Sequence, residues 1–229
     1  MVDFGEILYN ISIWIVPALV AITLHEAAHG FVAWKLGDDT AKRQGRVTFN
    51  PLKHIDPMGT IIIPGMLLLL KAPFLFGYAK PVPVNFGRLG SPRRDMVWVA
   101  LAGPAMNFIL AFVFALGYHV LDFFPVDVAQ WLADNFRNAI ILNVVLGVFN
   151  LLPLPPLDGG RVAVGILPNA LAIPLAKLER YGFLILIGAI FILPLIFRQF
   201  GSDFNPVSWL LNEPIGYVVN LIANLAGLK

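Results

Sequence analysis

The sequence predicts an all-α polytopic membrane protein whose helices cross the bilayer about four to six times. The 229 residues are 58% hydrophobic and only 13% charged, whereas charged residues make up about 25% of ordinary soluble domains. The mean hydropathy is +0.78, and several apolar runs approach the roughly 20 residues that a helix needs to cross the hydrocarbon core. We expect a single integral-membrane domain over residues 1–229.

The first predicted span covers residues 6–36. Ile7 to Ala21 is almost wholly apolar and contains Pro17. A secretory signal peptide carries Lys or Arg ahead of its apolar run and a small-residue cleavage site after it. This N-terminus instead begins with Asp3 and Glu6, so we expect the segment to be retained as a helix that crosses the membrane.

The region between the first two spans is predicted to stay on one side of the membrane. Residues 37–57 are basic, which favours the cytoplasmic side. Residues 45–50 alternate like a short strand, and the prolines of 81–87 favour extended backbone at an edge. The apolar run 58–71 is about half a span long and has basic flanks on both sides, so we expect it to enter the membrane and return.

Three further spans are predicted at 95–121, 135–152 and 180–197 from their apolar character. The loop after 121 carries aspartates and no Lys or Arg before Arg137, as expected for an outside loop. The tail 205–226 is apolar but interrupted by Asn212-Glu213-Pro214. We expect this tail either to cross the membrane or to lie in its interface.

The motif with the clearest chemistry is His25-Glu26-Ala27-Ala28-His29, inside the first predicted span. On an α-helix, side chains four residues apart leave the same face one turn apart. Two imidazoles at that spacing can bind one zinc ion, with the glutamate beside the metal. A pair of buried histidines bonded to backbone carbonyls is the alternative, but ionisable groups inside a span are costly and usually functional. The chain has no cysteine, so the ligands must be imidazole and carboxylate.

A catalytic zinc site needs a third protein ligand and an open position. The carboxylates in or beside the other apolar segments are mainly Asp158, Glu179 and Glu213. Asp158 follows the third predicted span in a proline- and glycine-rich stretch, and a helix broken at that point lets a carboxylate reach a buried site. We therefore predict Asp158 as the third ligand, the alternative being a turn residue beside Gly159-Gly160.

Three residues are candidates for catalysis. Glu26 is expected to accept the proton of the water that the metal activates. Asn150, an amide in the third predicted span, is a candidate donor to the developing oxyanion, or else a hydrogen bond between helices. His54 is brought near the metal if the re-entrant element carries it there, and otherwise bonds to Asp56. We expect Asn107, in the second span, to be a packing residue.

Three motifs occur in one order along residues 25–160. They are His25-Glu26-x-x-His29, Ala102-Gly103-Pro104-x-x-Asn107 and Asn150-x-x-Pro153-x-x-x-Leu157-Asp158-Gly159. This combination resembles the site-2 protease family of intramembrane zinc metalloproteases. The resemblance implies that His25, His29 and Asp158 bind zinc, that Glu26 is catalytic, and that Asn150 contacts the substrate or the transition state.

The same resemblance implies a three-span catalytic core, here about 6–160, followed by C-terminal helices in 161–229. It also implies zinc enclosed toward the cytosolic side and a membrane-associated β-loop between the first two core spans, which matches 46–50 and 81–87. The sequence contains no insert between the spans that could hold a PDZ domain and no CBS pair. It therefore resembles a short member of the family.

We thus expect an intramembrane zinc metalloendopeptidase with one zinc ion per chain. A hydrolytic site at membrane depth meets the transmembrane segments of other proteins, so we expect regulated intramembrane proteolysis of such substrates within the lipid bilayer. The net charge of +2 is too small to indicate nucleic-acid binding. A compact chain without targeting extensions fits a prokaryotic plasma (inner) membrane, and the sequence leaves the oligomeric state open.

Two alternatives remain, one from a different functional class and one a different enzyme. A non-hydrolytic zinc-binding protein or transporter would spread carboxylates or histidines along several spans, whereas here they gather at one place. An unrelated membrane zincin would use Glu179 or Glu213 as its third ligand.

Overall fold

The computed structural model describes residues 4–62, 66 and 79–228. Within these residues the regular structure is helical, and no strand is formed. Four helices of the described chain are long and apolar enough to cross a membrane: Phe4–Lys35, Pro92–Phe123, Val126–Asn150 and Glu179–Gln199. The predicted class, an all-α polytopic membrane protein, is confirmed.

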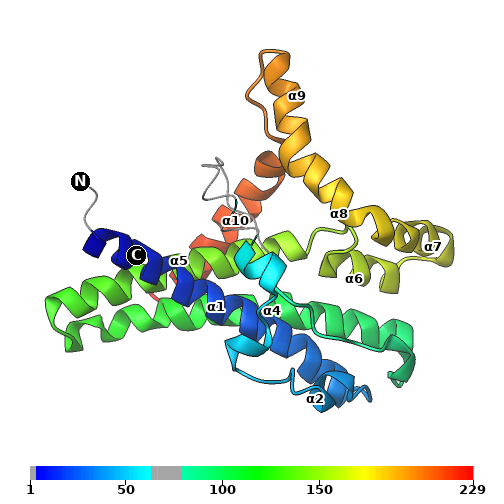
Figure 1. The fold of residues 1–229 in the computed structure, drawn as a ribbon, viewed down its shortest axis with the longest axis horizontal. Helices are drawn as coiled ribbons and strands as arrows, with labels where there is room; N and C mark the ends of the chain where they lie inside the picture. The colour runs from blue at the N-terminus through cyan, green and yellow to red at the C-terminus, as the bar shows by residue number, and fades with distance from the viewer. Residues whose placement is uncertain (1–3, 63–65, 67–78, 229) are drawn as a thin grey trace.

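Three of these helices form the core: α1 (Phe4–Lys35), α4 (Pro92–Gly117) and α5 (Val126–Asn150). They lie along one another in Figure 1, and each packs against the other two. Small residues let membrane helices approach closely. The buried positions of α4 include Ala100, Gly103, Ala111 and Ala115.

The predicted third span, 135–152, starts too late. α5 already begins at Val126, because polar groups in its first turns find partners on α1. Tyr9 Oη donates a hydrogen bond to Asp134 Oδ2 at 2.6 Å, and Trp131 Nε1 donates one to Ser12 Oγ at 2.9 Å. The predicted second span, 95–121, corresponds to α4 followed by η4 (Tyr118–Phe123).

The chain after α5 leaves the core through a proline-rich turn. The next elements are α6 (Asp158–Ile166), which packs on α4, and α7 (Asn169–Lys177). The fourth span follows as α8 (Glu179–Ile187), η5 (Gly188–Ile192) and α9 (Leu193–Gln199). It projects away from the core helices in Figure 1, and only 6% of its apolar window is buried, against 44% for the span that begins with α4. Most of its apolar surface is therefore left for lipid.

The C-terminal tail folds back onto the core as α10 (Pro206–Leu225). Ala111 and Ala115 of α4, Val144 of α5 and Ile222 of α10 share one buried cluster. Pro214 lies inside the helix, so the predicted interruption does not divide the tail.

The predicted strand at 45–50 is wrong. Residues 47–49 form bends, because side chains bond to the local backbone and turn the chain. Thr48 Oγ1 accepts a hydrogen bond from the Asn50 amide at 3.2 Å, and Asn50 Oδ1 caps η1 (Pro51–Lys53) by accepting one from the Leu52 amide at 3.0 Å. Residues 79–85 are extended but belong to no strand, and η3 (Phe86–Arg88) follows them.

The predicted re-entrant run 58–71 is described only at its start. Pro57–Ile62 forms a π-helical turn, η2, and apart from Met66 the rest of the run lies outside the described residues.

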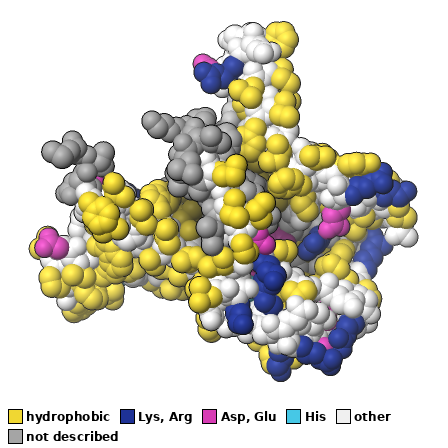
Figure 2. Space-filling view, viewed as in Figure 1, with side chains coloured by type: hydrophobic (Ala, Val, Ile, Leu, Met, Phe, Trp, Pro, Cys, Tyr) yellow, Lys and Arg dark blue, Asp and Glu magenta, His cyan; other side chains and the backbone are white. Residues whose placement is uncertain are grey.

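Charge is distributed unevenly over the molecule. Figure 2 shows apolar side chains over much of the visible face, with Lys and Arg gathered near α2 (Thr40–Arg43) and α7. The C-terminal end of α1, with Lys35, lies at this basic end, whereas the loop and first turn at the start of α5 carry Asp122 and Asp127. The two ends of the spans therefore differ in charge.

Candidate metal centre

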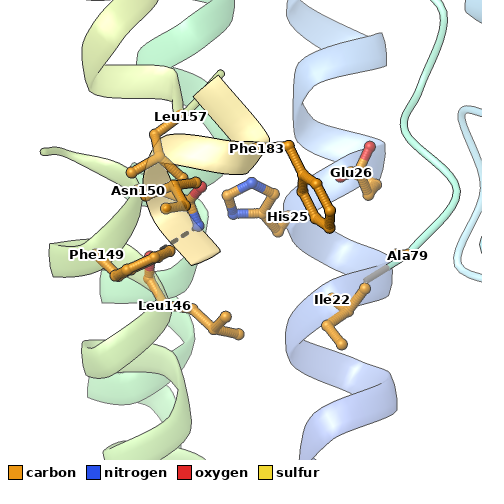
Figure 3. Close-up of a pocket in the computed structure, with 10 residues that line it drawn as sticks. Ile22, His25, Glu26, Ala79, Leu146, Phe149, Asn150, Leu157 and Phe183 are labelled. Atoms are coloured by element: carbon orange, nitrogen blue, oxygen red, sulfur yellow. Dashed lines mark hydrogen bonds between the residues drawn. The ribbon is translucent and has the colours of Figure 1, made fainter. Parts of the chain in front are cut away.

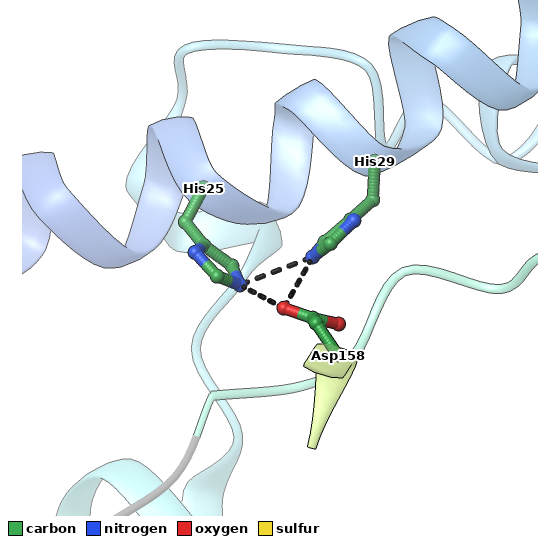
Figure 4. Close-up of side chains that lie close together, drawn as sticks. All are labelled: His25, His29 and Asp158. Carbon is green, nitrogen blue, oxygen red and sulfur yellow. Dashed lines mark hydrogen bonds and ion pairs between the residues drawn. The ribbon is translucent and has the colours of Figure 1, made fainter. Parts of the chain in front are cut away.

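Two elements bring three ligating side chains together. α1 presents His25 and His29 on one face, and Asp158 is the first residue of α6. The two Nε2 atoms are 3.0 Å apart, and each lies 3.3 Å from Asp158 Oδ2 (Figure 4). Among the described residues, this is a group of three that could hold a metal ion, and all three are buried.

The proline- and glycine-rich turn delivers Asp158 to the two histidines. α6 starts in close contact with the end of α5: a Cβ on Gly159 would lie 2.2 Å from the carbonyl oxygen of Leu151. Only glycine permits that approach. The chain stops being helical at the end of α5 and starts again at Asp158. This break brings the predicted third ligand, Asp158, to the predicted histidine pair.

Hydrogen bonds on the far side of each ring fix which nitrogen can bind a metal. His29 Nδ1 lies 2.7 Å from the Val99 carbonyl oxygen, and His25 Nδ1 lies 2.6 Å from Asn107 Oδ1. A carbonyl oxygen can only accept, so both Nδ1 atoms donate and both Nε2 atoms keep a free lone pair. Metal-ligating histidines are commonly oriented in this way.

The donor set fits zinc. Ligand atoms about 2.0–2.1 Å from a tetrahedral zinc ion lie roughly 3.3 Å from one another, close to the 3.0, 3.3 and 3.3 Å separations of the three atoms. Two lone-pair nitrogens and a carboxylate oxygen at these distances repel each other unless a cation lies between them. The geometry thus supports a single His₂Asp metal site.

Asn107 does more than the expected packing. It is fully buried, and its Nδ2 donates to Asn143 Oδ1 at 2.8 Å. Asn143 Nδ2 in turn donates to the Ala139 carbonyl at 2.8 Å. This chain of amides orients Asn107 so that its oxygen faces His25. The sequence placed Asn107 in a predicted span and in the Ala102-Gly103-Pro104-x-x-Asn107 motif, but it gave no sign of the contact with His25.

Replacing Asn107 by leucine is expected to weaken zinc binding by about 10- to 100-fold, the usual effect of removing a hydrogen-bond partner of a metal ligand. Asn138→Leu is the matched control, because Asn138 is another buried amide that ties α5 to α1, donating to the Ile13 carbonyl at 2.9 Å. Competition with a chromogenic chelator measures the zinc affinity of both variants. If both variants lost zinc affinity equally, Asn107 would have only a packing role.

Gly103 gives the metal site its space, which sequence reasoning did not detect. A Cβ at this position would lie 2.4 Å from His29 Nε2 and 2.6 Å from His25 Nε2. These are nearly metal–ligand distances, so the missing side chain of Gly103 faces the point where the donor atoms converge.

Glu26 and Asn150 lie where two cavities meet the metal ligands. A cavity of about 510 Å³ has mostly apolar walls, including Ile22, Leu146 and Phe183, and it also reaches His25, Glu26 and Asn150. A second, of about 260 Å³, contains all three metal ligands together with Glu26 and Asn150.

The close-up of the larger cavity shows that Asn150 of α5 and His25 of α1 face each other (Figure 3). Asn150 Nδ2 donates to the Leu146 carbonyl of its own helix at 2.9 Å. Its amide therefore makes no bond that ties two helices together among the contacts of the described residues, and it remains available to the cavity.

His54 is placed elsewhere. Its ring Nε2 bonds to the Thr48 carbonyl at 3.2 Å, and it is not among the described residues that line these two cavities. The expected partner, Asp56, instead accepts a hydrogen bond from the Gly59 amide at 2.7 Å. Burial lowers the pKa of His54 more than its hydrogen bond to Thr48 raises it, so the ring is neutral at neutral pH.

The alternative third ligands do not approach the histidines. Glu179 forms an ion pair with Arg161 at 3.2 Å, and its side chain is half exposed. Glu213 lies on α10 and is exposed. In the described chain, the carboxylate beside both imidazoles is that of Asp158.

Comparison with known proteins also indicates zinc-dependent peptide hydrolysis. The model of peptidase family M50 matches residues 123–195, which include Asn150 and Asp158. The chain is 43% identical over 189 residues to the Bacillus subtilis protein named "Putative zinc metalloprotease YwhC", covering 79% of this chain and 80% of that protein. It is 33% identical over 195 residues to "Putative zinc metalloprotease Rip2" of Mycolicibacterium smegmatis, covering 85% and 71%.

A more distant relative is "Zinc metalloprotease MJ0392" of Methanocaldococcus jannaschii, 25% identical over 182 residues that cover 78% of this chain and 39% of that protein. No solved structure matches the chain. The relatives favour an enzyme over the transporter alternative, and zinc over other metals for the His₂Asp site. Similarity over 80% of the Bacillus subtilis protein and 71% of the Mycolicibacterium smegmatis protein, together with the family match, shows that the chain belongs to peptidase family M50, the site-2 protease family, and that it is a zinc metalloprotease.

Proposed function

We propose that this protease cleaves peptide bonds in or near the transmembrane segments of membrane proteins, as in regulated intramembrane proteolysis. The observation that carries the proposal is the position of Glu26 and His25, which line an apolar cavity of about 510 Å³ between membrane-spanning helices. The cavity of about 260 Å³ that holds all three candidate ligands shares both residues with it. Such walls favour apolar side chains. A helix hides its peptide bonds in its own hydrogen bonds, so the substrate must unwind locally before it is cut.

Zinc, when bound by His25, His29 and Asp158, supplies a Lewis acid that polarises the peptide carbonyl and makes water more acidic. Glu26 acts as the general base. It takes a proton from the attacking water as the C–O bond forms, and it returns that proton to the nitrogen as the C–N bond breaks. Atoms and charge balance, because one water is consumed for each peptide bond.

Asn150 is our candidate for contacting the substrate. It is one of the few polar side chains on the larger cavity, and an amide N–H there can stabilise the negative charge that develops on the carbonyl oxygen. His54 bonds to Thr48 and lines neither cavity, so we assign it to its loop and not to the reacting atoms.

We further propose that the His₂Asp site lies toward the cytoplasmic side of a prokaryotic plasma membrane. His25 and His29 lie in the last third of α1, nearer to the basic end of the spans than to the acidic end, and basic residues favour the cytoplasmic side. The relatives come from bacteria and an archaeon. Residues 6–160 would form the catalytic core of a single domain.

Glu26→Gln tests the proposed function. The variant is expected to lose at least about a hundredfold in cleavage rate, since a general base contributes 10²–10⁴-fold, while its zinc content stays at the wild-type level. The assay uses purified protein in liposomes with a panel of single-span substrates, and Glu6→Gln, at the exposed start of α1, is the control. Full activity of Glu26→Gln would show that Glu26 is not the general base. If the wild-type protein cut soluble peptides but none of the single-span substrates, the proposal that it cleaves in or near transmembrane segments would be wrong.

A further inference from the structure

The extended segment 79–85 runs along the C-terminal part of α1, and two of the three residues nearest Glu26 have no backbone donor. Pro81 and Pro83 have no N–H group. Between them, the Val82 N–H donates a hydrogen bond to Glu26 Oε2 at 2.7 Å. The sequence Pro81-Val82-Pro83 thus leaves one donor at this point of the chain, and that donor binds the glutamate of the His-Glu-x-x-His motif.

Contacts on both sides of Val82 hold the segment in place. Before it, the Lys80 N–H donates to the His54 carbonyl at 3.0 Å, and Arg46 Nη2 donates to the Lys80 carbonyl at 2.6 Å. After it, the Asn85 N–H donates to Asp38 Oδ2 at 2.6 Å. Arg46 and Asp38 are both buried.

The side chain of Val82 adds a packing contact. It is buried, and its Cγ1 lies close enough to α1 that a Cβ on Gly30 would be 3.0 Å away. The position of the Val82 N–H is therefore fixed by neighbours before it, after it and beneath it.

This arrangement restrains a flexible side chain. A glutamate side chain has three rotatable bonds, and a misplaced catalytic group lowers the rate of a reaction even when the ligands of the site are intact. A hydrogen bond from a fixed N–H to a carboxylate is charge-assisted and stronger than a neutral one. Because Val82 holds one carboxylate oxygen, the other remains free to exchange a proton.

We propose that Val82 is a positioning residue whose backbone N–H holds Glu26 in its reactive orientation, and that Arg46 supports it by anchoring Lys80. This inference rests on the proposed role of Glu26 as general base. It assigns to the 79–85 segment a function that depends on its backbone and not on its side chains.

The main test compares Val82→Pro with Val82→Ala. Proline removes the N–H, and it suits an extended segment that already contains prolines on both sides. Alanine removes the same apolar contacts with α1 but keeps the N–H. We expect Val82→Pro to lower kcat by about 10- to 100-fold, part of the 10²–10⁴-fold that a general base contributes, with KM and zinc content within about twofold of wild type. Val82→Ala, which keeps the N–H, should have a kcat within a few-fold of wild type.

A double-mutant cycle separates positioning from general damage. In a Glu26→Gln background no carboxylate is left to position, so Val82→Pro is expected to cause little additional loss. If Val82→Pro caused damage unrelated to Glu26, the double variant would instead lose kcat by the product of the two single-variant factors.

Each outcome decides the inference. Unchanged kcat in a zinc-loaded Val82→Pro variant, or equal losses in the proline and alanine variants, would overturn it. If Val82→Pro does not fold, Arg46→Met replaces it: a lower kcat at full zinc content supports the inference, and unchanged kcat or loss of zinc overturns it. The wild-type protein and Glu26→Gln are assayed beside these variants. Failure of the proposed function would appear in those two proteins, independently of Val82.

Discussion

Gly103→Ala is expected to abolish zinc binding while leaving the helices intact. The added methyl group would lie 2.4–2.6 Å from the Nε2 atoms of His29 and His25, at the point where the three donor atoms converge. We expect zinc affinity to fall by at least about a hundredfold, because losing even a hydrogen-bond partner of a ligand costs 10- to 100-fold. Alanine favours a helix over glycine by about 0.5–1 kcal/mol, so a weaker α4 would not be the cause.

Zinc content after purification and chelator competition measure this effect, with circular dichroism to confirm the helices. Gly216→Ala is the matched control, since an added Cβ there meets nothing within 4 Å. A Gly103→Ala protein with a full complement of zinc would mean that α4 can move away from the histidines, which would contradict the assigned role of Gly103.

Asp158→Ala is expected to have a comparable effect, because it removes one of the three protein ligands. Its carboxylate lies 3.3 Å from both imidazole nitrogens, and without it only two neutral ligands remain. Purified Asp158→Ala should retain much less than one zinc ion per chain, with an affinity at least about a hundredfold below wild type.

Glu179→Ala is the informative comparison for this prediction. Glu179 also follows an apolar segment, but it is paired with Arg161 and half exposed, so its variant should keep one zinc ion per chain. The reverse result, with zinc lost from Glu179→Ala and kept by Asp158→Ala, would reinstate the unrelated-zincin alternative. Both variants are measured by metal analysis under the same purification conditions, which makes them directly comparable.

Much of the site could be predicted because its geometry is local. The spacing of His25 and His29 places both on one helix face whatever the rest of the chain does. The prolines before Asp158 end the preceding helix, because proline cannot continue the helical hydrogen bonds. Gly159 and Gly160 lie inside the next helix, α6, and let it start close to the end of α5. Hydropathy located the spans to within a few residues, except at the start of α5, where Trp131 and Asp134 are satisfied by partners on α1.

The failures arose where distant contacts decide the local structure. The alternation at 45–50 is a weak preference for strand, and no strand partner is present in the described residues. Bonds from Thr48 and Asn50 to the nearby backbone turned the chain instead. For His54 the sequence left two alternatives open, a position near the metal or a hydrogen bond to Asp56. The ring bonds to the Thr48 carbonyl instead, because the path of the loop and not the residue type sets where a side chain points.

The sequence by itself predicted the membrane class, the zinc chemistry and the three candidate ligands, since hydropathy, helical periodicity and helix breaking act over neighbouring residues. Only the tertiary structure decided how those ligands are supported. Asn107 orients His25, Gly103 leaves room for the metal, and Val82 holds Glu26. Gly103 and Asn107 belong to the Ala102-Gly103-Pro104-x-x-Asn107 motif, but the motif does not say what either residue contacts. Their roles, and that of the Val82 N–H, follow only from the distances that the packed helices and the 79–85 segment impose.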